Sequence, residues 1–181
     1  MTDDVVMAGF GGQGLMAIGK ILAKAAMQDG RHVTWLPSYG PEMRGGTANC
    51  VVVMDDEPVA SPVVQHARAA IVMNKQSIDK FEPTLVPGGL LVVNSSLIDR
   101  HADRTDLRVV ELPANTLAEA AGSEKSANMV MLGAYVGASG VVSGASVEHA
   151  IELNFGGKKA VAETALAAYR RGFELGRAAV A

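Results

Sequence analysis

Short, continuously apolar segments alternate with longer segments of helical periodicity along this chain. Residues 5–8 and 90–93 are apolar without interruption, whereas residues 15–28 repeat apolar side chains at the spacing of one helix face. Uninterrupted apolar strands that alternate with helices are typical of a mainly parallel sheet covered on both faces. We therefore predict an α/β fold: a single Rossmann-like domain over residues 1–181, with a mainly parallel sheet and helices on both faces.

The predicted elements follow one another without a linker, repeat or low-complexity segment. The predicted strands cover residues 5–8, 32–36, 48–54, 69–73, 90–93 and 107–112. The predicted helices cover residues 15–28, 77–81, 116–121, 128–138, 146–153 and 158–179.

The composition indicates a compact globular protein, because 49% of residues are hydrophobic and 19% are charged. The net charge of −3 and the lack of a basic run give no reason to expect a nucleic-acid partner. The first residues are acidic, unlike the basic start of a signal peptide. The uncharged stretch at residues 126–145 is diluted by serine and glycine, so we predict a buried helix followed by a turn. We expect a cytoplasmic protein without a membrane partner.

Cysteine and histidine usage limits the metal chemistry of the chain. Cys50 is the only cysteine, which excludes an internal disulfide and an iron–sulfur site of four thiolates. The four histidines are scattered without metal-ligand spacing. We therefore expect no metal site here, and any iron–sulfur cluster that the protein needs must lie on another chain.

The residues after the first predicted strand, GFGGQG at positions 9–14, match the pattern G-x-G-x-x-G directly before a helix. Gly9 permits a tight turn, and Gly11 and Gly12 let the backbone approach a phosphate. Gly14 lets the helix pack closely on the strand, with its free N–H groups facing an anion. Glycines can also serve only a strand-to-helix turn, but this context favours phosphate binding. The predicted cofactor-binding residues are these four glycines and Gln13.

A dinucleotide site of the usual kind also needs an acid at the end of the second strand, to bind the ribose hydroxyl groups. The second predicted strand ends in residues 34–38, which contain no acid. Asp29 and Arg31 precede this strand, and Glu42 and Arg44 lie well beyond it. The glycine motif therefore argues for a phosphate contact but against NAD.

A segment rich in proline and glycine follows at residues 37–46, and we predict a loop of defined shape that presents Tyr39, Glu42 and Arg44. Arginine can bind a carboxylate or phosphate bidentately, and both tyrosine and arginine favour interfaces. An internal ion pair between Glu42 and Arg44 on a turn is the alternative. From these residues alone the two interpretations are equally good.

Six segments in order carry a more specific signal. They are GFGGQG (9–14), PSYGPEMRGGTANC (37–50), MNKQSIDKF (73–81), PGGLLVVNSSL (87–97), SANMVMLGA (126–134) and AYRRGFELG (168–176). Together they resemble the gamma subunit, or gamma domain, of the 2-oxoacid:ferredoxin oxidoreductases over nearly the whole chain. The run from Ser38 to Arg44 is the most specific part of this resemblance.

The resemblance implies a multi-subunit enzyme that decarboxylates a 2-oxoacid oxidatively, forms an acyl-CoA and passes electrons to ferredoxin. Thiamine diphosphate, Mg²⁺ and the iron–sulfur clusters would lie on partner subunits: alpha, beta and, where one exists, a ferredoxin-like delta chain. This chain would be non-catalytic alone and hold no cofactor tightly, while contributing to coenzyme A binding at the subunit boundary. Its 2-oxoacid is left open, with 2-oxoglutarate or a branched-chain oxoacid slightly favoured.

The resemblance also implies roles for particular residues. The glycine loop would contact coenzyme A, and Ser38, Tyr39, Glu42 and Arg44 would face neighbouring chains near the thiamine site. We also expect residues 126–145 and 37–46 to be exposed association surfaces on the lone chain.

Asn74 and Asn128 each follow an apolar segment, where a polar side chain needs a partner. Either could line the same crevice or cap a helix, and capping is slightly favoured. Two alternatives to the gamma subunit remain at this stage: a freestanding oxidoreductase with a nucleotide cofactor on the glycine loop, and a purely structural spacer.

Overall fold

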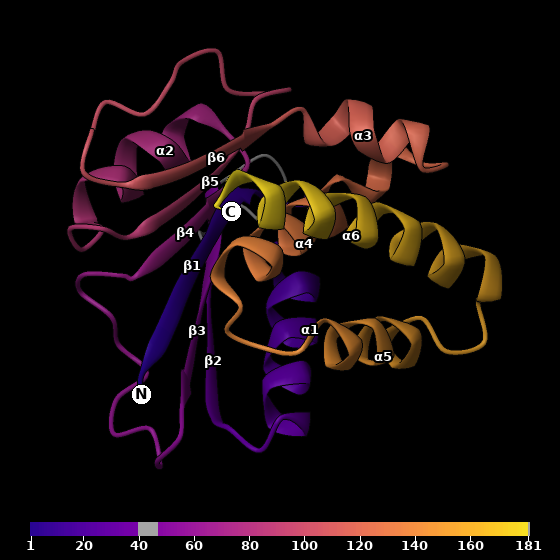
Figure 1. Ribbon diagram of the computed structural model, residues 1–181, viewed down its shortest axis with the longest axis horizontal. Helices are drawn as coiled ribbons and strands as arrows, with labels where there is room; N and C mark the ends of the chain where they lie inside the picture. Colours follow the sequence, from indigo (N-terminus) through magenta and orange to yellow (C-terminus); the bar gives the residue numbers. More distant parts are fainter. Residues whose placement is uncertain (40–46, 181) are drawn as a thin grey trace.

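The computed structural model describes residues 1–39 and 47–180, and a six-stranded sheet lies at its centre (Figure 1). The strands are β1 (Asp3–Phe10), β2 (His32–Tyr39), β3 (Thr47–Asp55), β4 (Ala69–Val72), β5 (Leu90–Asn94) and β6 (Arg108–Leu112). Their order across the sheet is β2-β3-β1-β4-β5-β6. The pairings from β1 through β4 and β5 to β6 are all parallel, which confirms the mainly parallel sheet.

The sequence did not predict the direction of β3. It runs antiparallel to both β1 and β2. A parallel crossover needs a dozen or more connecting residues, and the connection between Tyr39 and Thr47 is shorter than that. The chain therefore returns as an antiparallel neighbour of β2, and β3 lies between β2 and β1.

The predicted loop at residues 37–46 began too early, because Pro37, Ser38 and Tyr39 are the last residues of β2. Proline lacks the N–H that a central strand must donate, and this argued for a loop. However, β2 is an edge strand, where proline is tolerated. Glu42 and Arg44 lie outside the described residues.

The helices agree with the predicted ones to within about two residues at each end. They are α1 (Leu15–Gln28), α2 (Lys75–Phe81), α3 (Ala114–Ala120), α4 (Ala127–Ser139), α5 (Gly144–Asn154) and α6 (Lys159–Ala179), with short 3₁₀ segments η1 (Glu82–Thr84) and η2 (Glu124–Ser126). Along residues 1–39 and 47–180, no helix is both long and apolar enough to cross a membrane.

The core has two parts because successive strand residues point to opposite faces of the sheet. Val5 and Met7 point toward α1 and α3–α6, whereas Val6 and Ala8 point toward α2. Figure 1 shows this unequal division, with most helices on one side and α2 on the other. Helices on both faces were predicted and are confirmed.

The helix α4 is almost wholly buried, since every residue from Ala127 to Val136 is buried. It ends at Gly140, which has a left-handed φ of 65°. The predicted buried helix and turn are thus confirmed for this stretch. The expectation that residues 126–145 form an exposed association surface is wrong, because α6 packs over α4 and supplies its apolar environment.

Glycines allow the backbones of α4 and α6 to touch. Gly133 and Gly137 of α4 face α6, and Gly172 and Gly176 of α6 face α4. A Cβ at Gly172 would overlap the carbonyl group of Val130, and the other three positions are similarly blocked by backbone atoms. Backbone atoms cannot swing away as the end of a side chain can, so this crossing requires glycine.

We expect Gly172→Ala to destabilise the protein by about 1–3 kcal/mol, the usual cost of overpacking a core. This loss should appear although alanine favours helix by roughly 1 kcal/mol over glycine. Equilibrium urea unfolding measures the change. Gly156→Ala is the matched control, since its nearest neighbour is the Leu153 carbonyl oxygen at 3.5 Å, and it should be close to neutral. A stabilised Gly172→Ala protein would contradict the close crossing.

Candidate binding site

A crevice of about 360 Å³ lies beyond the carboxyl ends of the parallel strands. The chain passes from β1 to one side of the sheet and later from β4 to the other, so β1 and β4 flank a topological switch point. Ligands of open α/β sheets bind at such points. The crevice is lined by Gly12, Gln13, Met73, Leu97, Asn115, Glu124, Lys125, Ala127 and Asn128.

The glycine loop forms one wall, and Gln13 fixes its shape. The Phe10 N–H donates to Gln13 Oε1 at 2.6 Å, and Gln13 Nε2 donates to the Met73 carbonyl oxygen at 3.4 Å. A Cβ at Gly9 would overlap this Gln13 oxygen and press against the Met73 side chain. Gln13 therefore fastens the loop to the end of β4, in addition to lining the crevice.

The remaining glycines of the loop differ in their surroundings. Gly12 is exposed, has a φ of 96° and has open space where a side chain would start. Gly11 is half-buried beside it. Gly14 begins α1 with a φ of 77°, and a Cβ there would overlap the Asn128 side chain. The predicted close packing at Gly14 is thus against α4, whereas the tight contact beside the strand is at Gly9.

Asn128 links the beginnings of two helices. It lies in the first turn of α4, is 7% exposed and donates from Nδ2 to the Gly14 carbonyl oxygen at 3.2 Å. It also lines the crevice, so the slight preference for a capping role was wrong for this residue.

Asn74 has the capping role instead. Its Oδ1 accepts a hydrogen bond from the Ser77 N–H at 2.9 Å and caps α2 on the other side of the sheet. Its Nδ2 is buried without a hydrogen-bond partner. Asn74 does not line the crevice, because it points away from the face on which Met73 lies.

Two helix starts in the crevice favour an anion, while the two charged side chains at its rim are of opposite sign. The helices α1 and α4 both begin there, and neither has an acidic residue in its first turn or a side-chain cap. The N-terminus of a helix carries a partial positive charge, so both helix starts attract anions. Lys125 of η2 adds a full positive charge at the rim, and the neighbouring Glu124, which also lines the crevice, adds a full negative charge.

The opposite wall is held by a chain of hydrogen bonds. Asn94, fully buried at the end of β5, donates to Asn115 Oδ1 at 2.9 Å, and Asn115 donates to Glu124 Oε1 at 3.0 Å. Sequence reasoning missed these three residues and Lys125. Asn94 follows an apolar strand as Asn74 does, and that signal could have found it. Asn115, Glu124 and Lys125 can be assigned to the crevice only from the tertiary structure.

The run that begins at Ser38 lies at the same end of the sheet as the glycine loop, but in the described residues it does not line the crevice. Phe10 pairs with Thr47, and Tyr39 pairs with Ala48, so β1 and β2 both finish at the same end of the sheet. Ser38 is exposed there. The strand β3 separates it from β1.

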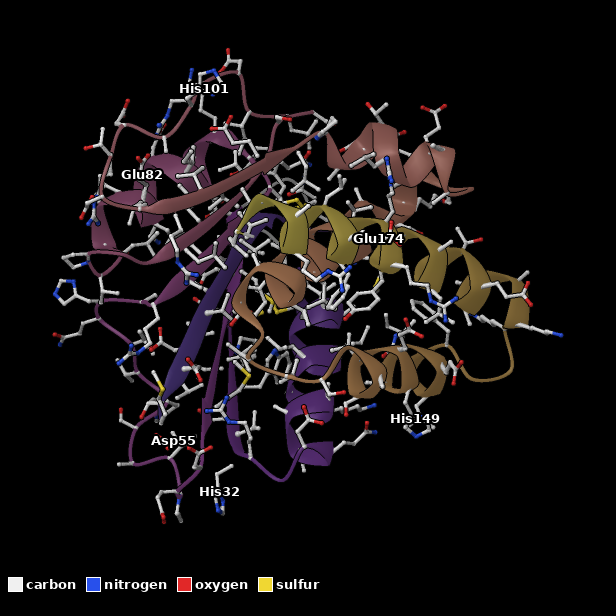
Figure 2. The ribbon with its side chains drawn as sticks, viewed as in Figure 1. His32, Asp55, Glu82, His101, His149 and Glu174 are labelled. Carbon is white, nitrogen blue, oxygen red and sulfur yellow. The ribbon has the colours of Figure 1, made fainter. Side chains whose placement is uncertain are left out.

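The described residues outside the crevice show neither a metal-binding group of side chains nor an activated cysteine nucleophile. Figure 2 shows His32, His101 and His149 far apart on the periphery, and residues 1–39 and 47–180 contain no group of three or more metal-ligating side chains. Cys50 is buried beneath α1, and this burial raises the pKa of its thiol to about 11. The thiol therefore stays protonated at neutral pH and is a poor nucleophile.

Comparison with known proteins gives a consistent result. The family model described as pyruvate ferredoxin/flavodoxin oxidoreductase matches residues 4–175. Ketoisovalerate oxidoreductase subunit VorA of Methanothermobacter thermautotrophicus is 37% identical over 175 residues, which cover 96% of this chain and 36% of that protein. The chain thus spans about a third of the length of this relative.

Two solved structures share the fold. The gamma subunit of a keto/oxoacid ferredoxin oxidoreductase from Geobacter sulfurreducens is 32% identical with a TM-score of 0.88, covering 99% of this chain and 98% of that one. A 2-oxoglutarate:ferredoxin oxidoreductase from Magnetococcus marinus, with 2-oxoglutarate, coenzyme A and succinyl-CoA bound, is 23% identical with a TM-score of 0.89. It covers 98% of this chain and 31% of that chain.

The contact between Gly14 and Asn128 can be tested by a double-mutant cycle. Gly12→Ala should cost about 1–2 kcal/mol through its left-handed backbone alone. Gly14→Ala should cost more, because its side chain also meets Asn128. Adding Asn128→Ala to Gly14→Ala should remove that extra cost, so the two changes should be non-additive in urea unfolding. Strict additivity would show that the two residues do not press on each other.

Proposed function

The chain belongs to the pyruvate ferredoxin/flavodoxin oxidoreductase family, and on this premise we propose that it is the gamma subunit of a cytoplasmic 2-oxoacid:ferredoxin oxidoreductase that contributes to coenzyme A binding. The whole complex would decarboxylate a 2-oxoacid oxidatively, form an acyl-CoA and reduce ferredoxin. The observation that carries the proposal is the end-to-end overlap with a gamma subunit at 32% identity. We also propose that residues 1–181 form a single domain.

The crevice residues fit the phosphate groups of coenzyme A. Two helix N-termini and Lys125 supply positive charge, and Gly12 leaves the backbone open to a close approach. Asn115 and Asn128 offer amide groups to the remainder of the ligand. The bound coenzyme A in the Magnetococcus marinus enzyme supports this choice of ligand.

The redox chemistry would belong to other chains. Cys50 is buried and alone, so this chain supplies no set of thiolates for an iron–sulfur cluster. We propose that alpha and beta subunits hold thiamine diphosphate, Mg²⁺ and the clusters, with a delta chain as a further candidate. Ser38, Tyr39, Glu42 and Arg44 would face these neighbours.

A freestanding enzyme with a dinucleotide cofactor is disfavoured by the topology. In a dinucleotide site the strand that carries the ribose-binding acid lies directly beside β1. Here β3 occupies that position, and the displaced β2 ends in Ser38 and Tyr39 rather than in an acid. The structural spacer is the alternative that the experiments below address.

The isolated chain should not reduce ferredoxin with any 2-oxoacid, whereas the complex purified from native extract should do so. The measurement is ferredoxin reduction by each preparation, combined with analysis of bound thiamine and iron. Turnover by the isolated chain would contradict the proposed division of labour.

In the assembled complex, Lys125→Gln should raise the KM for coenzyme A roughly 3- to 10-fold, equivalent to about 0.7–1.4 kcal/mol. Lys24→Gln is the matched control, because Lys24 is exposed on α1 outside the crevice.

Gly14→Val should raise the KM for coenzyme A roughly tenfold or more by displacing the start of α1, and Gly12→Ala should raise it less. Bound thiamine should not change in these variants. Normal coenzyme A kinetics in assembled Lys125→Gln and Gly14→Val complexes would favour the spacer.

A further inference from the structure

One apolar row crosses the face of the sheet on which α2 lies. The strand register aligns Leu36 with Val51, Val51 with Val6, Val6 with Ala70 and Ala70 with Leu91. Such a row is normally covered where the strands are parallel, whereas antiparallel strands such as β2 and β3 can leave one face to solvent.

The cover stops partway along this row. Leu91 and Ala70 are fully buried and Val6 is 5% exposed, but Val51 is only half-buried and Leu36 is 41% exposed. The cause is that α2 lies against β1 and β4, whereas β2 and β3 have a helix, α1, on their other side only (Figure 1). The β2–β3 end of the face thus has no helical cover in the described residues.

The uncovered end is a shallow groove and not a flat wall. A hollow of about 200 Å³ lies between β3 and α2, and Val51, Val64 and Phe81 line it together with polar side chains such as that of Lys80. The neighbouring Val63 is 67% exposed. Apolar side chains that gather on one surface mark an interaction site. We call the surface formed by Leu36, Val51 and Val64 the open face.

We propose that the open face packs against one particular partner: the separate chain that corresponds to the part of VorA lying outside the matched segment. This inference rests on the proposed function. In VorA, 64% of the protein is additional to the segment that this chain matches, so the same domain occurs as part of a longer polypeptide. A domain that also occurs alone must keep the surface that meets the rest of the enzyme.

The position of Ser38 supports this choice of face. Residues two apart on a strand share a face, so Ser38 lies on the same side of β2 as Leu36 and is exposed. The partner-facing run of the proposed function begins at Ser38. The open face is therefore continuous with the interface that the proposed function already requires, while α5 and the exposed side of α6 are remote from it.

The test uses the complex purified from native extract, whose chains are identified by mass spectrometry. A chain that copurifies is accepted as the proposed partner only if its sequence is related to the part of VorA that lies outside the matched segment. It is then co-expressed with this chain carrying Leu36→Lys or, as the matched control, Leu153→Lys, which alters a side chain that is 57% exposed on α5. Urea unfolding first establishes that both variants fold like the wild type.

We expect Leu36→Lys to weaken the complex at least tenfold and Leu153→Lys to leave it unchanged. Hydrogen exchange of the wild-type complex should be slowed at residues 32–38 and 63–64 relative to the lone chain. If the complex forms but neither result appears, the open face is not the docking surface and the proposed function still stands. Failure to capture any such chain would overturn both. Concentration-dependent dimers of the lone chain that Leu36→Lys abolishes would identify a second copy as the occupant and overturn this inference.

Discussion

The crossing of α4 and α6 is the contact on which the rest of this structure depends. Backbone meets backbone there because Gly133 and Gly137 of one helix lie against Gly172 and Gly176 of the other. With α6 this close, α4 is enclosed between α6 and the sheet, and nearly all its side chains can be apolar. The fold therefore gains an inner helix whose position is fixed by direct backbone contact with α6.

The candidate site takes its geometry from that inner helix. Asn128 stands in the first turn of α4 and reaches the carbonyl group of Gly14, where α1 begins. The two positively polarised helix starts are held together by this single amide, and Gln13 fastens the glycine loop to the end of β4. The candidate site is thus assembled from core elements and not from a separate surface feature.

The sequence was sufficient for the type of nearly every element, because apolar runs and helical periodicity report which faces are buried. It was insufficient where the outcome depended on neighbours. Pro37 was taken as a loop residue because edge placement is invisible in the sequence. Residues 126–145 were correctly predicted as a buried helix and a turn, but the sequence did not show that α6 covers this helix, so the same residues were also expected to form an association surface. The glycine loop was found by its spacing, whereas Lys125 and Asn115 reach the crevice only through tertiary packing.

The anchoring of the crevice in α4 has a thermodynamic consequence. A ligand that binds only the folded chain stabilises it by RT ln(1 + [L]/Kd), about 2.7 kcal/mol at a hundredfold excess over Kd. Here the crevice is lined by the glycine loop, the first turn of the buried α4 and the wall that contains Asn115 and Glu124, so occupancy of the crevice and global unfolding are coupled. Variation in the level of the ligand would then alter how long this subunit persists before it is unfolded and degraded.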